Sequence, residues 1–139
     1  DLETGIVTEE QLDDGACDFP RINDSLIGLN SEFGYCMQLK TDVEDLTFGE
    51  HLFKYHLESG KRTDHYLGKN VAGGEPVFAP KPGSSKEDEG WILSLVHERE
   101  TRQSKLVIID AEAFDHEPVA EVIIPQRVPY GAHGSWIQN

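Results

Sequence analysis

The chain has 139 residues, which is long enough for one domain with a hydrophobic core. Its 12 basic and 26 acidic residues give a formal net charge of −14, which argues against nucleic acid or an anionic membrane surface as the main partner. A neutral or hydrophobic small molecule fits this charge better. The longest apolar runs have about four residues, far short of the roughly 20 that cross a bilayer, so no transmembrane segment is expected.

Nothing in the sequence resembles a signal peptide, and this predicts a cytoplasmic protein. The two cysteines, Cys17 and Cys36, form no CxxC pair, so we expect both to be reduced and buried rather than joined in a disulfide. The chain begins at Asp1 instead of a methionine, and residues 1–5 have the pattern of the middle of a β-hairpin. We therefore expect the protein to continue upstream.

Period-two alternation of β-branched and aromatic residues predicts strands in five segments: residues 32–40, 51–57, 90–96, 104–109 and 119–124. Residues 57–61 suit a hairpin turn with Gly60 in the left-handed conformation, and residues 81–85 form a polar loop. Only residues 110–114 suggest a helical turn. The fold class predicted from these patterns is almost all-β.

An internal repeat indicates which all-β architecture the chain adopts. Residues 1–12 realign on residues 56–67 at an offset of 55, with five of twelve positions identical. Farther along, Asp18 and Glu75 lie 57 residues apart, and His133 follows Glu75 by 58 residues. A period of ~40 to 55 residues holding about four strands is typical of β-propeller blades.

In a propeller the three polar residues occupy equivalent positions on the inner strands of successive blades and face the axis. The alternative is that their spacing is a coincidence, since chance matches in repeats are common. Propellers close with about 4 to 8 blades, whereas this chain supplies about two and a half. The remaining blades are expected upstream or in another chain.

The six histidines form no HExxH motif or closely spaced Cys/His cluster. His51 and His56 face opposite sides of one strand, His65 and His116 lie in polar, turn-like contexts, and His97 ends a strand, so these five are expected at the surface. The sixth, His133, lies between small residues, where a backbone approaches something closely. It is the one candidate metal ligand.

Residues 125–136 (Pro-Gln-Arg-Val-Pro-Tyr-Gly-Ala-His-Gly-Ser-Trp) resemble the C-terminal motif of the carotenoid cleavage oxygenases, the family that includes lignostilbene dioxygenases and the retinoid isomerase of the eye. The same resemblance extends to residues 19–23, 74–78, 80–83, 87–91 and 106–111, in the family's order. It covers nearly the whole chain.

The resemblance implies that residues 1–139 are the C-terminal blades of a seven-bladed β-propeller, within a single oxygenase domain. In that family Fe(II) lies on the propeller axis, bound by four histidines, and glutamates orient three of them. His133 matches the last ligand and Glu75 matches its glutamate. Asp18 matches another of these carboxylates but is one methylene shorter, and Ala132 stands where phenylalanine is common, so we expect weaker iron binding.

The implied activity is oxidative cleavage of a conjugated C=C bond in a carotenoid, apocarotenoid or stilbene, with O₂, to two carbonyl products. His133 is implied as an iron ligand, no catalytic residue is assigned, and the fragment needs its upstream blades to be active. The alternative is an iron-free, divergent propeller fragment acting as a binding or scaffold module, which the departures at Asp18 and Ala132 favour. A third possibility is a complete small β-domain.

Overall fold

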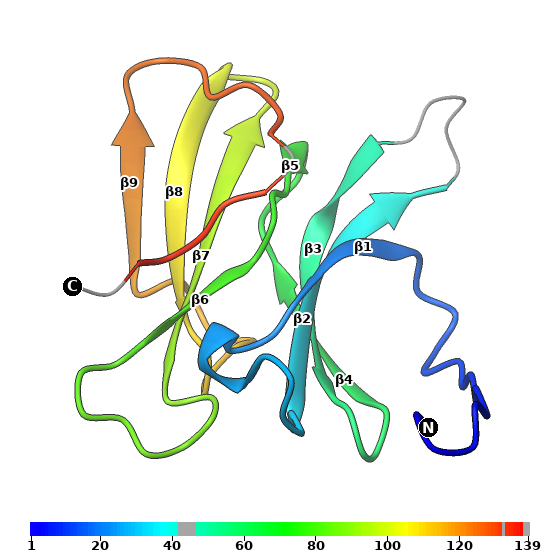
Figure 1. Cartoon of the computed structure of the whole chain (residues 1–139). Helices are drawn as coiled ribbons and strands as arrows, with labels where there is room; N and C mark the ends of the chain where they lie inside the picture. Colours follow the sequence, from blue (N-terminus) through cyan, green and yellow to red (C-terminus); the bar gives the residue numbers. More distant parts are fainter. Residues whose placement is uncertain (42–46, 132, 138–139) are drawn as a thin grey trace.

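The computed structural model describes residues 1–41, 47–131 and 133–137, and it consists of two antiparallel sheets (Figure 1). The first sheet has the order β1-β2-β3-β4, with bounds β1 (Cys17–Arg21), β2 (Phe33–Lys40), β3 (Thr47–His56) and β4 (Lys61–Tyr66). The second has the order β5-β7-β8-β9 with β6 also paired to β7, and its bounds are β5 (Val71–Ala72), β6 (Val77–Pro80), β7 (Gly90–Glu98), β8 (Gln103–Asp110) and β9 (Ala120–Ile124). The all-β prediction is confirmed.

The five predicted strands correspond to β2, β3, β7, β8 and β9. The period-two alternation did not locate β1, β4, β5 or β6, which are short or lack an apolar alternation, although the repeat had placed Asp18 of β1 on an inner strand. The turn between β3 and β4 is as predicted, because Gly60 has φ +66° and its amide donates to the His56 carbonyl at 2.9 Å. This turn fixes the register of the hairpin.

One local prediction was wrong. Residues 110–114 do not form a helical turn: β8 ends at Asp110, and a turn follows that is closed by the bond from the His116 amide to the Ala113 carbonyl. Residues 1–5 form the turn expected in the middle of a hairpin, with Gly5 at φ +70° and its amide bonded to the Asp1 carbonyl at 3.0 Å, although this turn lies outside both sheets. Among the described residues the one helix is a 3₁₀ turn, η1 (Asp24–Leu26), and no helix there is long and apolar enough to cross a membrane.

The main core lies between the two sheets. Register places Tyr35, Met37 and Leu52 on one face of the first sheet, because Tyr35 pairs with Lys54 and Met37 with Leu52. They pack against alternate residues of β7 and β8, such as Ile92 and Ile109. Alternation thus sends one face of each sheet into a shared core.

Two residues lie elsewhere than expected. His65 is buried in β4 with 2% of its surface exposed, and its Nδ1 lies 2.8 Å from the Phe114 carbonyl, so the prediction of a surface histidine was wrong. The pairing of Leu52 with His65 puts this histidine on the core face, a position that local composition does not show. Both cysteines are free and Cys36 is buried as expected, but Cys17 is exposed at the edge strand.

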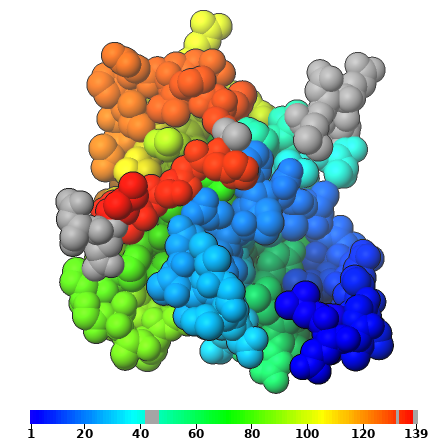
Figure 2. Space-filling model, in the orientation of Figure 1, coloured from blue at the N-terminus to red at the C-terminus, as the bar shows by residue number. Residues whose placement is uncertain are grey.

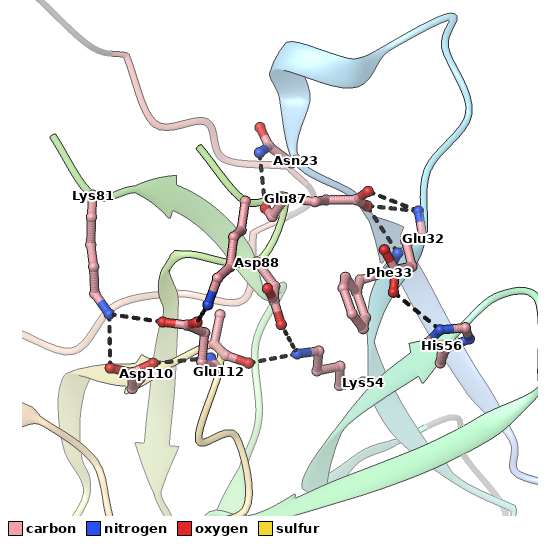
Figure 3. A network of polar contacts seen from close by, with 12 residues as sticks. Asn23, Glu32, Phe33, Lys54, His56, Lys81, Glu87, Asp88, Asp110 and Glu112 are labelled. Atoms are coloured by element: carbon pink, nitrogen blue, oxygen red, sulfur yellow. Dashed lines mark hydrogen bonds and ion pairs between the residues drawn. The ribbon is translucent and has the colours of Figure 1, made fainter. Parts of the chain in front are cut away.

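A polar network joins the two sheets below the core (Figure 3). The Glu87 carboxylate accepts hydrogen bonds at 2.9 Å from the backbone amides of Glu32, just before β2, and Phe33, the first residue of β2. The Lys54 amino group donates to Asp88 and to the Ala111 carbonyl, each at 2.7 Å. The loop that precedes β7 is therefore attached to the first sheet by charge-assisted bonds.

The outer face of the second sheet is apolar and open. Leu95, Leu106 and Val122 are cross-strand neighbours on this face, and Leu95 and Val122 are 46% and 50% exposed. A row of this kind is typical of a surface that another sheet covers.

We predict that Lys54→Met lowers the free energy of unfolding by about 3 kcal/mol, because it leaves the Asp88 carboxylate without its counter-charge in a mostly buried position. The matched control is Lys40→Met, which breaks the more exposed pair with Glu50 and is expected to cost about 1 kcal/mol or less. Urea unfolding of the protein that contains this chain measures both. Equal costs for the two variants contradict the prediction.

We also predict that His65 makes stability depend on pH. Burial lowers the pKa of His65, and the bond to the Phe114 carbonyl offsets this only in part. The His65 imidazole therefore binds a proton more readily in the unfolded chain than in the folded protein. As the pH drops below 6.5 toward the lowered pKa, the free energy of unfolding decreases. His65→Asn is expected to flatten this dependence in thermal melts, whereas His116→Asn, at an exposed position, leaves it unchanged.

Candidate metal-ligand site at His133

The segment after β9 returns toward β5 and then crosses in front of the second sheet toward the C-terminus (Figures 1 and 2). The Val128 amide donates to the Ser104 hydroxyl at 2.9 Å, and the Tyr130 ring packs edge-on against Phe48 at 5.1 Å. These contacts attach the segment to β8 of one sheet and β3 of the other. They bring His133 to the side where β1 and the β5–β6 connection meet.

Glu75 lies in the break between β5 and β6 and not within a strand. Glycine is required just before it, because a Cβ atom at Gly74 would collide with the Leu95 carbonyl. The Ser94 hydroxyl holds the Gly74 backbone through bonds of 3.0 and 3.3 Å. This close approach to β7 fixes where the Glu75 side chain begins.

The structure brings Glu75 and His133 together. The Glu75 Oε1 atom lies 3.0 Å from His133 Nδ1, and Oε2 accepts the Gly134 amide at 2.6 Å. The Glu75 side chain is 8% exposed, whereas that of His133 is 74% exposed. The imidazole is therefore held at one nitrogen and open on its other side.

The carboxylate sets the tautomer of this histidine. Burial alone would raise the pKa of Glu75, but the hydrogen bonds from His133, the Gly134 amide and Arg21 outweigh it and hold the pKa below its usual value. An ionised carboxylate only accepts, so the proton of the neutral imidazole is on Nδ1. The lone pair is then on Nε2, the nitrogen that a metal ion binds in this arrangement.

Arg21 is a further member of the site that sequence reasoning did not single out. Its Nη1 donates to Glu75 Oε1 at 3.0 Å and to the Gly134 carbonyl at 2.7 Å. The signal was present, because Arg21 lies within residues 19–23, one of the stretches that carry the family resemblance. Its role depends on a contact 54 residues away, which local patterns do not show.

Phe19 packs against the imidazole, with its ring edge-on to His133 at a centroid distance of 5.5 Å. Its backbone has φ +54°, a left-handed conformation that costs about 1 kcal/mol or more for a residue with a Cβ atom. Strand β1 carries a bulge at this point. Strain of this kind is common beside functional sites.

Asp18 does not join this pair in the structure. It lies in β1, as an inner-strand position requires, but it is exposed and its carboxylate accepts the amide of its own neighbour, Phe19, at 2.7 Å. Its predicted role concerns another histidine that is not part of this chain, and it stays a prediction. Ala132 lies outside the described residues.

The residues fit one ligand position of a metal site. His133 offers a free Nε2 on an exposed ring, with Nδ1 held by a carboxylate. In the part of the chain that the structure describes, no three His, Cys, Asp or Glu side chains group together to hold a metal ion. A metal ion at His133 would therefore need further ligands besides these groups.

A hollow of about 280 Å³ opens beside His133 and Glu75. Its other lining is mainly apolar and includes Phe48, Leu93 and Trp136. The site thus combines one oriented imidazole with an apolar surface.

Comparison with known proteins shows which family the chain belongs to. The family model described as retinal pigment epithelial membrane protein matches residues 1–138. A carotenoid cleavage oxygenase of Mycobacterium tuberculosis is 35% identical over 97% of this chain, and the apocarotenoid-15,15'-oxygenase of Synechocystis is 29% identical over 100% of it. The chain spans about a quarter of these relatives, 27% and 28% of their lengths.

Solved structures of apocarotenoid oxygenases also match this chain. Cobalt-substituted Synechocystis apocarotenoid oxygenase matches with a TM-score of 0.83 and 30% identity, over 92% of this chain and 26% of that one. An ACO/RPE65 chimera matches with a TM-score of 0.87 and 26% identity, and the match covers 100% of this chain and 29% of the chimera.

These structures are seven-bladed β-propellers, so the two sheets described here are blades of that fold. The chain belongs to the carotenoid cleavage oxygenase family, which the retinal pigment epithelial membrane protein model represents.

We predict that Glu75→Gln loosens the segment that carries His133. All the groups facing Glu75 are donors, so the amide nitrogen of glutamine would face a donor, and one charge-assisted bond worth about 1.5–3 kcal/mol is lost. Hydrogen exchange of the Gly134 amide is expected to accelerate about 10- to 100-fold. Glu89→Gln, which changes a surface acceptor, is the control. Unchanged exchange in Glu75→Gln would refute the arrangement.

Proposed function

We propose that this chain is the C-terminal part of a non-haem iron(II) dioxygenase that cleaves a conjugated C=C bond of a carotenoid or apocarotenoid to two carbonyl products. The observation that carries the proposal is the Glu75–His133 pair, in which a buried carboxylate leaves Nε2 of an exposed imidazole free. Membership of a family whose relatives bear the names of carotenoid and apocarotenoid oxygenases supports the reaction class.

In this proposal His133 binds iron and Glu75 and Asp18 orient ligating histidines. Neutral imidazole ligands leave the metal's charge intact, so bound iron supplies Lewis acidity and open positions for O₂. His133 acts only as a ligand and moves no proton, since its Nδ1 hydrogen stays on the Glu75 side. The cobalt-substituted relative shows that a transition metal is accepted in this fold.

The surroundings of His133 suit an alkene. The hollow next to it is lined mainly by apolar side chains, which favour a hydrophobic substrate and exclude water from the bond that is cleaved. The relatives that match are carotenoid enzymes by name, which favours a carotenoid or apocarotenoid over a stilbene as the substrate.

The remaining iron ligands are proposed to lie in upstream blades. The open apolar face of the second sheet, with Leu95 and Val122 half exposed, supports additional blades that cover it. The chain alone is therefore expected to be inactive. The cytoplasmic location stays a prediction from the sequence.

The second candidate is an iron-free binding or scaffold module. Its support is Asp18, whose shorter carboxylate is exposed and bonded to the adjacent amide. If the histidine that Asp18 should orient is poorly held, iron binding is weakened.

Metal analysis and product analysis of the full-length protein that contains this chain separate the two functions. We expect about one iron per chain in the wild type, with loss of iron and of cleavage in His133→Ala, because the other ligands alone cannot complete the site. His116→Ala, at an exposed position far from the pair, is the control and is expected to keep both.

The assay offers an apocarotenoid, a carotenoid and a hydroxystilbene and detects the carbonyl products by mass spectrometry. Cleavage of the stilbene alone would overturn the substrate choice. An iron-free wild type that cleaves none of the three would leave the binding module as the function.

A further inference from the structure

We propose that Arg21 is a positioning residue for His133: its guanidinium holds the Glu75 carboxylate and the Gly134 carbonyl together and thereby fixes the direction of the imidazole. This inference rests on the proposed function of His133 as an iron ligand. Arg21 does not touch the metal position itself and acts through Glu75 and the backbone.

One guanidinium nitrogen joins the two parts of the site. Nη1 carries two hydrogens, and it donates one bond to Glu75 Oε1 at 3.0 Å and one to the Gly134 carbonyl at 2.7 Å. The first acceptor orients the ring of His133, and the second belongs to the residue that follows it. Ring and backbone of the ligand are therefore fixed by the same group.

The other end of the guanidinium is held as well. Nη2 donates to both carboxylate oxygens of Asp24, at 3.2 and 3.0 Å. The Arg21 side chain is 15% exposed and that of Asp24 is 40% exposed. Asp24 thus holds the guanidinium on its solvent side. A lysine has a single ammonium group and could not bond Asp24 and Glu75 with two separate nitrogens as the guanidinium does.

A bulge in β1 directs Arg21 to this position. Asp18 pairs with Met37 and Arg21 pairs with Tyr35, so three steps on β1 oppose two on β2. A regular strand would pair Pro20 with Tyr35 and turn Arg21 to the opposite face. The extra residue, with Phe19 at φ +54°, places Arg21 on the face of Tyr35, which looks toward the second sheet.

The charges at Glu75 explain why a cation is needed there. The carboxylate is 8% exposed, and besides Arg21, which carries a permanent positive charge, it accepts from one imidazole and one backbone amide. A nearly buried carboxylate without a counter-charge is costly and would turn toward water. Arg21 keeps it in place, so its two oxygens stay aimed at His133 and Gly134.

The test measures iron release from the full-length protein that contains this chain, loaded anaerobically with Fe(II) and mixed with a coloured ferrous chelator. Arg21→Gln is expected to release iron about 10-fold faster, the low end of the 10–100-fold cost of groups that orient metal ligands. Arg21→Lys, which keeps the charge without the fork, is expected to fall between wild type and Arg21→Gln.

The matched control is Arg62→Gln. Arg62 forms a comparable clamp, from Nη1 to Asp13 at 2.9 Å and from Nε to Asp64 at 2.7 Å, but it lies in the β3–β4 hairpin, away from His133. It is expected to leave iron release at the wild-type rate. If both arginine variants accelerate release equally, Arg21 contributes only to general stability and the proposal is overturned.

A double-mutant comparison tests whether Arg21 acts through Glu75. Arg21→Gln combined with Glu75→Gln is expected to release iron no more than about 2-fold faster than Glu75→Gln alone, because groups in one network are not additive. Effects that multiply would show that Arg21 acts independently of Glu75, and would overturn the proposal.

A metal-independent measurement separates this inference from the proposed function. In metal-free protein, Arg21→Gln is expected to accelerate hydrogen exchange of the Gly134 amide about 10-fold, because loss of one charge-assisted bond is worth at least about 1.5 kcal/mol. Unchanged exchange overturns the positioning role, whether or not iron is bound. A wild type that holds no iron, with accelerated exchange in the variant, overturns only the proposed function.

Discussion

A carboxylate taken almost entirely out of water must be given donors, and the arrangement around Glu75 follows from that requirement. Its donors come from two places in the sequence, Arg21 in β1 and residues 133–134 after β9, and Glu75 itself lies in a third, between β5 and β6. The hydrogen bonds to this one buried carboxylate therefore connect the two sheets and the C-terminal segment. The same bonds determine which nitrogen of His133 is free.

The packing of the two sheets supplies the frame for this charge cluster. Each sheet buries one face in a shared core, and the loop before β7 is attached to the first sheet through Glu87 and Asp88. The core and these polar bonds together set the position of β1 relative to the β5–β6 connection, and Arg21 bridges the two through its bond to Glu75.

The sequence predicted those features that short-range pattern and motif carry. Alternation located five strands, and the motif around His133 identified the candidate ligand and the partner that contacts it in the structure, Glu75. What it missed depends on register between distant segments. His65 is a core residue because Leu52 opposes it, and Arg21 reaches Glu75 because a bulge shifts β1 against β2. Neither pairing leaves a local signature.

The two carboxylates predicted to orient ligands illustrate the difference between position and environment. Glu75 and Asp18 recur at a similar place in the repeat, yet Glu75 is buried among donors from other segments, while exposed Asp18 bonds the amide next to it. Burial makes a carboxylate dependent on specific partners and so gives it a fixed direction; an exposed one is solvated in many orientations. For this reason the Glu75 carboxylate fixes the direction of the His133 imidazole.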